Sequence, residues 1–196
     1  MSISPQQAAT ALDDIAQTES RSRELQGNRV GAPILMMWGV ISLLGYVATG
    51  LSSVHGPIWI LLSFIGTVAS FFLSRRANSS MPSPNIHARR VTWTWVTIMA
   101  FYFATLAVMH PREINQLNAF PALLVAGTYT MMGIWAWRRY AILGVAIFAL
   151  TLIGSYGLNW YRESGSPALP SSFFSFWMAG VMGFGLFLGG LWLRKA

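Results

Sequence analysis

The sequence contains no cysteine, and only 10% of its residues carry a charged side chain. Without cysteine the chain has no disulfide bond, no thiolate metal site and no catalytic thiol. Apolar side chains, in contrast, make up 54% of its 196 residues. A chain of this length with so few charges is typical of a membrane protein rather than of a water-soluble domain.

Six apolar runs account for most of this composition. A bilayer core about 30 Å thick is crossed by roughly 20 apolar helical residues, and each run is close to that length. The predicted spans are residues 33–53, 57–74, 91–109, 119–137, 140–158 and 172–193. We therefore predict an all-α fold: a polytopic membrane domain over residues 31–196, with six transmembrane helices arranged as three hairpins, preceded by a polar N-terminal arm over residues 1–30.

No secretory leader precedes the first span, because some thirty mostly polar residues come before it. We therefore expect that span to be retained. The strongly basic balance of the chain, with a pI near 10.6, reflects its orientation in the membrane and its attraction to anionic lipid heads rather than nucleic-acid recognition.

The basic residues are distributed unevenly among the segments between the spans. Eleven of the thirteen lie in the arm, the second and fourth gaps and the C-terminal tail: Arg21, Arg23, Arg29, Arg75, Arg76, Arg89, Arg90, Arg138, Arg139, Arg194 and Lys195. Short loops rich in Lys and Arg stay cytoplasmic, which places both termini inside. Because an arginine at the bilayer centre costs about 2.5–3.5 kcal/mol, the pair in WAWRRYAIL predicts a tight cytoplasmic turn between the fourth and fifth spans.

Each predicted hairpin turns at a proline-containing outer link and returns to a basic cluster. The three cases are VHGPIW to FLSRR, HPREINQLNAFP to WAWRR, and SGSPALP to LWLRK. Duplication of a two-helix unit would produce this rhythm, and so would the charge alternation of any six-span protein with both termini inside.

With the chain length, these hairpins resemble the acid-resistance membrane protein HdeD family. The segment RSRELQGNRVGAPILMMWGV is similar to uncharacterised proteobacterial six-helix inner-membrane proteins. The resemblances imply a bacterial inner-membrane location and a role in stress or regulation.

The arm carries a helix-start signal. Ser4 and Gln7 form a capping-box pattern, and Pro5 stands at the first helical position, where its missing N–H is not needed. Acidic residues come early and arginines late, which suits the dipole of a helix that ends near Gly27 and Asn28.

A narrow apolar stripe of Ala8, Leu12, Ile15 and Ala16 runs along this arm helix at helical spacing. The stripe is too slight for a membrane anchor, so we predict an amphipathic cytoplasmic helix that docks against protein. Its partner is this chain's own cytoplasmic loops, a separate protein or a second copy. The residues predicted to make the contact are Leu12, Ile15, Arg21 and Arg23.

The predicted spans contain no Asp, Glu, Lys, Arg or His, which disfavours a proton- or ion-coupled transporter. Two pairs have the small-xxx-small spacing of closely packed helices, within the bundle or between copies: Gly66 with Ser70 and Gly185 with Gly189. No catalytic constellation or phosphate-binding loop is present, so we predict no catalytic site, no cofactor and no enzyme activity.

The outer side offers His55, His110 and Met109 as weak candidates for metal binding. Because a metal site needs three or four convergent ligands, we predict none here and interpret the two histidines as interfacial loop residues. A single imidazole with a pKa near ~6.5 would alternatively sense mild acid.

Two functions stay open. The first is a non-enzymatic inner-membrane protein that works through protein contacts of its arm and basic inner face, in a regulatory, stress-related or complex-subunit role. The second is a small-molecule binding or transport unit, resembling the small six-span binding components of vitamin importers. Its outward-facing aromatic pocket would be lined by Tyr46, Tyr102, Tyr129 and Tyr156.

Overall fold

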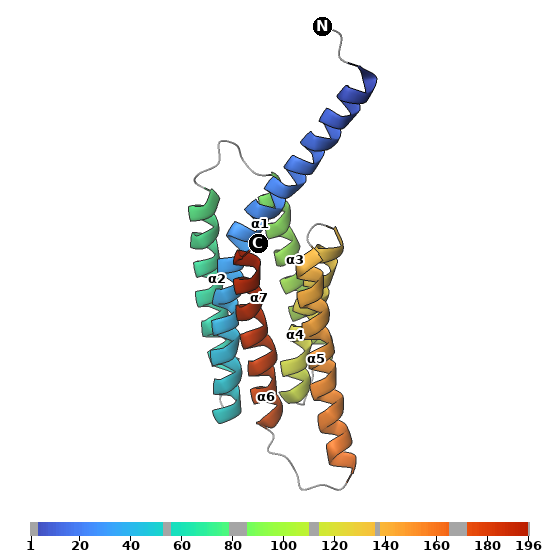
Figure 1. Cartoon of the computed structure of the whole chain (residues 1–196). Coiled ribbons are helices and arrows are strands. Elements are labelled where there is room, and N and C mark those ends of the chain that lie inside the picture. The colour runs from blue at the N-terminus through green and yellow to red at the C-terminus, as the bar shows by residue number, and fades with distance from the viewer. Residues whose placement is uncertain are drawn as a thin grey trace.

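The computed structural model of the chain is an all-helical bundle (Figure 1). The structure describes residues 4–52, 56–78, 86–109, 114–135, 138–164 and 172–195, and these ranges contain no strand. The first five helices are α1 (Pro5–Leu51), α2 (Gly56–Asn78), α3 (Ile86–Met109), α4 (Ile114–Trp135) and α5 (Arg138–Glu163). The last helix has three consecutive segments: α6 (Phe173–Met178), the π-helical η1 (Ala179–Phe184) and α7 (Gly185–Arg194).

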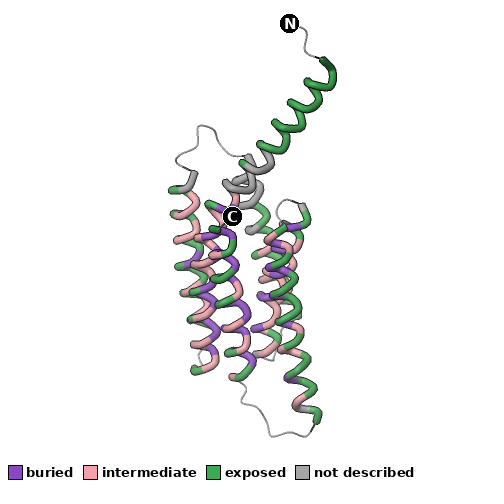
Figure 2. Tube along the Cα trace, viewed as in Figure 1, coloured by how far each residue is buried: buried purple, intermediate pink, exposed green. Residues whose placement is uncertain are grey.

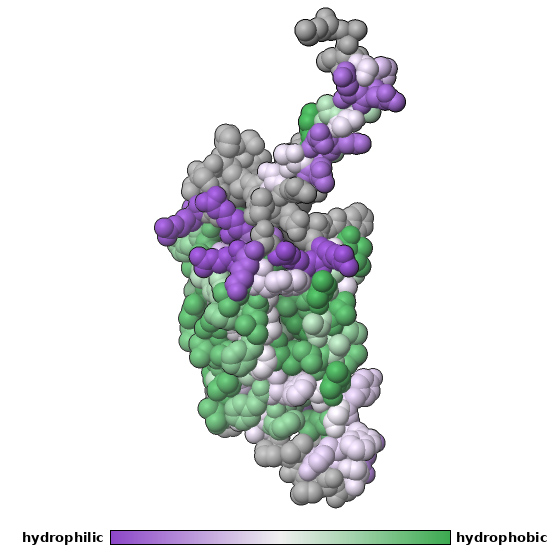
Figure 3. Space-filling view, viewed as in Figure 1, coloured by the Kyte–Doolittle hydropathy of each residue, from purple (hydrophilic) through white to green (hydrophobic). Residues whose placement is uncertain are grey.

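Five stretches within the described helices are long and apolar enough to cross a membrane. They are Gly27–Leu51, Gly56–Arg76, Asn115–Ile134, Arg138–Tyr161 and Phe173–Arg194. Within α3 the structure describes a shorter apolar stretch, Val96–Met109. An all-helical, multi-pass membrane protein is therefore the fold class that the sequence predicts correctly. On the face that Figure 3 shows, the apolar side chains form a band across the bundle, with more hydrophilic side chains above and below it.

Helix α1 runs without a break from Pro5 to Leu51, over 47 residues. The prediction that the arm helix ends near Gly27 and Asn28 is wrong. Asn28 is buried, and Gly31, one turn further on, lies against Tyr140 of α5, so packing holds this part of the chain in the helix. Pro33 also lies inside α1, a position that membrane helices tolerate when neighbouring helices surround the site.

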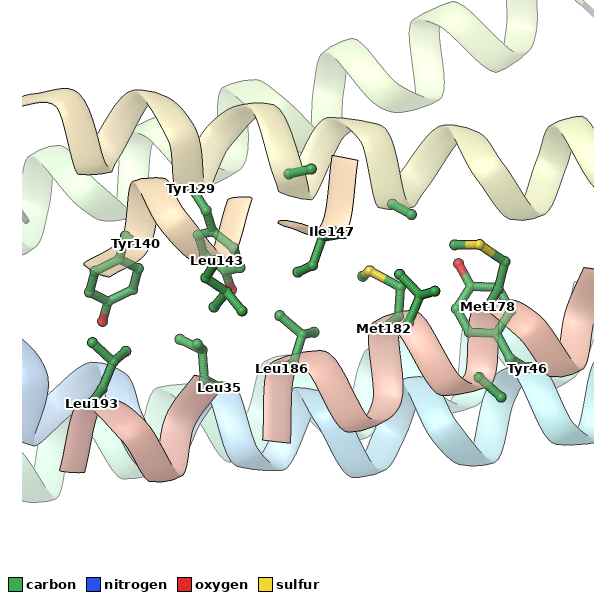
Figure 4. Close-up of a cluster of buried hydrophobic side chains, with 14 of the residues drawn as sticks. Leu35, Tyr46, Tyr129, Tyr140, Leu143, Ile147, Met178, Met182, Leu186 and Leu193 are labelled. Atoms are coloured by element: carbon green, nitrogen blue, oxygen red, sulfur yellow. The ribbon is translucent and has the colours of Figure 1, made fainter. Parts of the chain in front are cut away.

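The core lies between α1, α4, α5 and the last helix. Helix α1 packs along the α6–η1–α7 helix and also against α2, while α4 and α5 form the other closely packed pair. Figure 4 shows side chains from these helices meeting in the middle: Leu35 and Tyr46, Tyr129, Tyr140, Leu143 and Ile147, and Met178, Met182, Leu186 and Leu193. Helix α3 packs along α4 and leaves most of its described side chains exposed.

Glycines let α1 and the last helix approach main chain to main chain. A Cβ atom added at Gly39 would lie 2.7 Å from the main-chain nitrogen of Phe187 and 2.8 Å from the carbonyl oxygen of Gly183. One added at Gly190 would lie 2.8 Å from the carbonyl oxygen of Ala32. Small residues at such crossings are what permits close helix packing in lipid.

Both predicted small-residue pairs pack inside the chain. Gly66 faces Trp38 and Ile41 of α1, and Ser70 accepts a 3.1 Å hydrogen bond from Nε1 of Trp38. Gly189 faces Leu143 of α5, and Gly185 lies near Ile147 of the same helix. Of the two readings that the sequence left open for these pairs, the structure supports packing within the bundle.

The arginine pair of the WAWRRYAIL stretch occupies the first two positions of α5. Helix α4 ends at Trp135 and α5 begins at Arg138, so the connection is short. The two helices are in contact immediately beyond it, where Gly133 lies against Ala141 and Gly144 lies against Thr130. Residues 136 and 137, where the sequence predicts the tight turn, lie outside the described residues, and both arginines belong to α5.

Candidate functional site

The arm begins with the capping box that the sequence predicts. The main-chain N–H of Gln7 donates to Oγ of Ser4 over 3.2 Å, and the main-chain N–H of Ser4 donates to Oε1 of Gln7 over 3.1 Å. Pro5 occupies the first turn. These two bonds satisfy N–H groups that the helix start would otherwise leave without partners.

The first part of the arm is exposed on all sides. Residues 4–18 are all exposed, and Figure 2 shows this stretch leading out of the bundle. Leu12 is 67% exposed and Ile15 is 59% exposed, so neither packs on the described part of the chain. The loop around residues 79–85 and the side chains of Arg21 and Arg23 lie outside the described residues.

The cations gather at the end of the bundle from which the arm projects. We call this set the basic collar, and its members are Arg29, Arg75, Arg76, Arg138, Arg139, Arg194 and Lys195. All of them are exposed except Arg139, which is partly buried. Figure 3 shows hydrophilic side chains on this side of the apolar band.

Two collar arginines lie over aromatic rings. The Arg75 guanidinium carbon is 4.5 Å from the ring centroid of Phe71, one turn earlier in α2. That of Arg139 is 5.3 Å from the ring of Trp192 in α7, and Nη1 of Arg139 donates to the carbonyl oxygen of Trp192 over 3.3 Å. A guanidinium held in this way is favoured both by the ring and by the carbonyl end of a helix.

A buried polar cluster lies in the opposite half of the bundle. The Tyr46 hydroxyl donates to the carbonyl oxygen of Asn118 over 2.9 Å, and Nδ2 of Asn118 donates to Oγ of Ser175 over 2.9 Å. Nε1 of Trp59 donates to Oγ1 of Thr49 over 3.0 Å, and the Trp59 ring meets Tyr46 edge-on at 4.9 Å. Together these contacts join α1, α2, α4 and α6.

The structure does not bring the four predicted pocket tyrosines together. Tyr46 is buried in the polar cluster, and Tyr102 of α3 stacks on Phe120 of α4 at 5.7 Å. Tyr129 is buried near the basic end, beside Tyr140 at 5.8 Å. Tyr156 is 70% exposed on α5.

The structure describes one of the three weak metal candidates. His55 and His110 lie outside the described residues, and Met109 is exposed at the end of α3. In the part of the chain that the structure covers, no three His, Cys, Asp or Glu residues are grouped as a metal site would need.

Sequence reasoning missed the asparagines. The sequence predicts Asn115 and Asn118 in the link before the fourth span, yet both belong to α4, and Oδ1 of Asn115 is buried without a hydrogen-bond partner among the described residues. The sequence predicts a helix end at Asn28, yet Asn28 is 4% exposed, and within the described part of the chain neither polar atom of its amide has a hydrogen-bond partner. Neutral amides at the ends of apolar runs carry no charge that would mark them in the sequence as buried polar groups.

The chain matches no protein-family model, no curated protein and no solved structure. Its resemblance to the HdeD family stays a prediction.

Proposed function

We propose that this is a six-span bacterial inner-membrane protein with both termini in the cytoplasm, whose arm binds a cytoplasmic partner protein. The bundle holds that contact at the membrane, in a regulatory or stress-related role. One observation carries the proposal: α1 is a single helix whose first part is exposed on all sides, while its remainder packs against α2 and the whole of the last helix.

The orientation rests on the basic collar. Short segments rich in Lys and Arg stay on the cytoplasmic side, and the collar lies at the end from which the arm projects. A reporter that is active only outside the cytoplasm, fused after Ala196, tests this. We expect no activity, whereas a strong signal would reverse the orientation and place the arm outside the cell's interior.

The chemistry of the arm favours a protein partner over the lipid surface. Leu12 and Ile15 offer apolar contact area, but Asp13 and Asp14 lie beside them, exposed. Helices that bind lipid surfaces have broader apolar faces and basic flanks, because the cytoplasmic leaflet is negatively charged. Two adjacent carboxylates would be repelled from that leaflet, so a protein surface suits the arm better.

Face-specific photo-crosslinking in intact cells tests the proposed contact. A photo-reactive amino acid is placed at Leu12 or Ile15, and, as matched controls, at Gln6 or Gln17. All four positions are exposed in the same helix segment, and at 100° per residue the two glutamines fall on the opposite face. We expect Leu12 and Ile15 to form a crosslink to one and the same protein, and the glutamines to form little.

Three outcomes would count against the partner. Equal products from all four positions would mean non-specific collisions, and no product from any would mean an unoccupied arm. A product that contains this chain alone would replace the partner protein by a second copy. Removal of residues 1–18 is a further check, because the truncated bundle should still insert and fold while the biological activity is lost.

A second candidate function is binding of a small molecule in the half of the bundle opposite the collar. The observation that favours it is the buried Oδ1 atom of Asn115, near the polar cluster, which has no hydrogen-bond partner in the ranges that the structure describes. Such an atom would accept a hydrogen bond from a polar ligand. Native mass spectrometry should then show a stoichiometric small molecule that is lost in Asn115→Leu but retained in Asn159→Leu, a change at an exposed position of α5.

A further inference from the structure

Helices α5 and α7 lie side by side, and we call the surface along their contact, which begins at the basic collar, the α5–α7 face. Gly189 of α7 faces Leu143 of α5, and Gly185 lies near Ile147, so these residues mark the line of contact. The two helices run in opposite directions along this line. In such an antiparallel pair, the residues that precede two facing contact residues project to the same side.

The residues on that side are Ile142 of α5 and Leu188 of α7. Ile142 is 51% exposed and Leu188 is 59% exposed, and Trp192, one turn after Leu188, is also exposed. One side of the α5–α7 contact is therefore an apolar strip that no described part of the chain covers.

Arg139 stands at the collar end of this strip. Its guanidinium lies over the Trp192 ring and donates one hydrogen bond to the Trp192 carbonyl oxygen. A guanidinium has five N–H donors, and this contact uses one of them. Lys195 follows at the end of α7, and Arg138 precedes Arg139 in α5, so three cations stand at the collar end of the α5–α7 face.

The carboxylates that the structure describes lie elsewhere. Asp13 and Asp14 are on the arm, and Glu163 is at the opposite end of α5. The positive charges of Arg138, Arg139 and Lys195 repel one another, so an anion bound between them is favoured. A phosphate suits the site, because arginine donates to two of its oxygens at once.

We propose that the α5–α7 face binds one anionic phospholipid. The lipid phosphate contacts Arg139 and Lys195, and an acyl chain lies along Leu188 and Ile142. The apolar strip next to the cations favours a lipid over a free phosphate as the ligand, because only a lipid has an acyl chain that can contact it. Basic pockets between helices on the cytoplasmic side of membrane proteins are a known way of holding acidic lipid heads.

Native mass spectrometry of the full-length protein in detergent tests this binding. The probes are dioleoyl phosphatidylglycerol, dioleoyl phosphatidylcholine with the same chains, and inorganic phosphate. We expect a single phosphatidylglycerol adduct at several-fold lower concentration than the phosphatidylcholine adduct, and no retained phosphate. Equal binding of the two lipids overturns the site, and phosphate retained at the same affinity overturns the role of the acyl chain.

Variants of matched charge locate the site. Arg139→Gln and Lys195→Gln should each weaken phosphatidylglycerol binding about fivefold. Arg75→Gln is the control, because Arg75 also lies over an aromatic ring in the collar but belongs to α2. An equal loss in Arg75→Gln would mean that the collar attracts anions diffusely and that the α5–α7 face is not a site. Lys195→Gln keeps the test valid even if Arg139→Gln unfolds, because Lys195 lies beyond the end of α7.

Discussion

The hydroxyl of Tyr46 donates to the main-chain carbonyl oxygen of Asn118, tying α1 to α4 in the buried polar cluster. The Tyr46 ring is held edge-on to Trp59 of α2, so one side chain contacts two neighbouring helices. Hydrogen bonds between membrane helices are worth about 0.6–2 kcal/mol, so this contact should be measurable.

Tyr46→Phe removes the hydroxyl and keeps the ring. We expect the free energy of unfolding to fall by about 0.6–2 kcal/mol, measured by detergent-induced unfolding of the purified protein. Tyr156→Phe is the control, because Tyr156 is exposed on α5. If the two variants unfold alike, the Tyr46–Asn118 bond contributes nothing to stability.

Trp38 and Ser70 should be energetically coupled. The indole N–H of Trp38 donates to the Ser70 hydroxyl, so a double-mutant cycle of Trp38→Phe and Ser70→Ala should give a coupling energy of about 0.6 kcal/mol, and at most about 1.7. Thr67→Ala in place of Ser70→Ala should give no coupling, since the Thr67 hydroxyl donates to Ser63 in its own helix. Zero coupling for Trp38 and Ser70 would argue against this α1–α2 contact.

Gly39→Ala should weaken the packing of α1 on the last helix. The new methyl group would collide with main-chain atoms of Phe187 and Gly183, which cannot rotate away. Overpacking of this kind costs about 1–3 kcal/mol. Gly157→Ala, where no described atom apart from the nearby backbone of α5 lies within 4 Å of the added methyl group, should leave stability unchanged or raise it slightly. Thermal unfolding followed by circular dichroism ranks the variants, and a neutral Gly39→Ala would contradict the close crossing.

Ser4→Ala should fray the start of the arm. Loss of the side-chain cap costs a helix about 0.5–2 kcal/mol, so amide hydrogen exchange should speed up at residues 6–8. The helix inside the bundle should be unaffected, because its stability comes from packing. Gln17→Ala, an exposed change further along the arm, serves as the reference. Equal exchange in both variants would mean that the Ser4–Gln7 capping box is not formed in solution.

The spans and the arm cap could be predicted because they depend on local composition. Bilayer thickness fixes the length of an apolar run, and the hydrogen bonds of Ser4 and Gln7 stay within one turn. The α1 boundary could not be predicted in this way. Gly27 and Asn28 resemble a helix end, but Gly31 packs on Tyr140, more than a hundred residues later in the chain.

For the candidate sites too, the sequence predicts what depends on local composition and does not predict what depends on contacts between distant residues. That cations would avoid the apolar spans followed from the cost of placing a charge in lipid. The sequence did not predict which tyrosines contact one another. Apolar periodicity indicates which face of a helix is buried, but not how far along the bundle each side chain lies relative to the other helices. Tyr46 and Tyr129 therefore looked alike in the sequence, yet they lie in opposite halves of the bundle, one beside Trp59 and the other beside Tyr140.

The unbroken course of α1 has a mechanical consequence. At 1.5 Å per residue its 47 residues form a rod about 70 Å long. The proposed partner, bound near Leu12, would contact this helix far from the bundle. A small displacement of the arm would then tilt the part of α1 that packs in the bundle. Gly39 lies against Gly183 of the π-helical η1, so a tilt of α1 would act on the segment where the last helix departs from regular α-helical geometry.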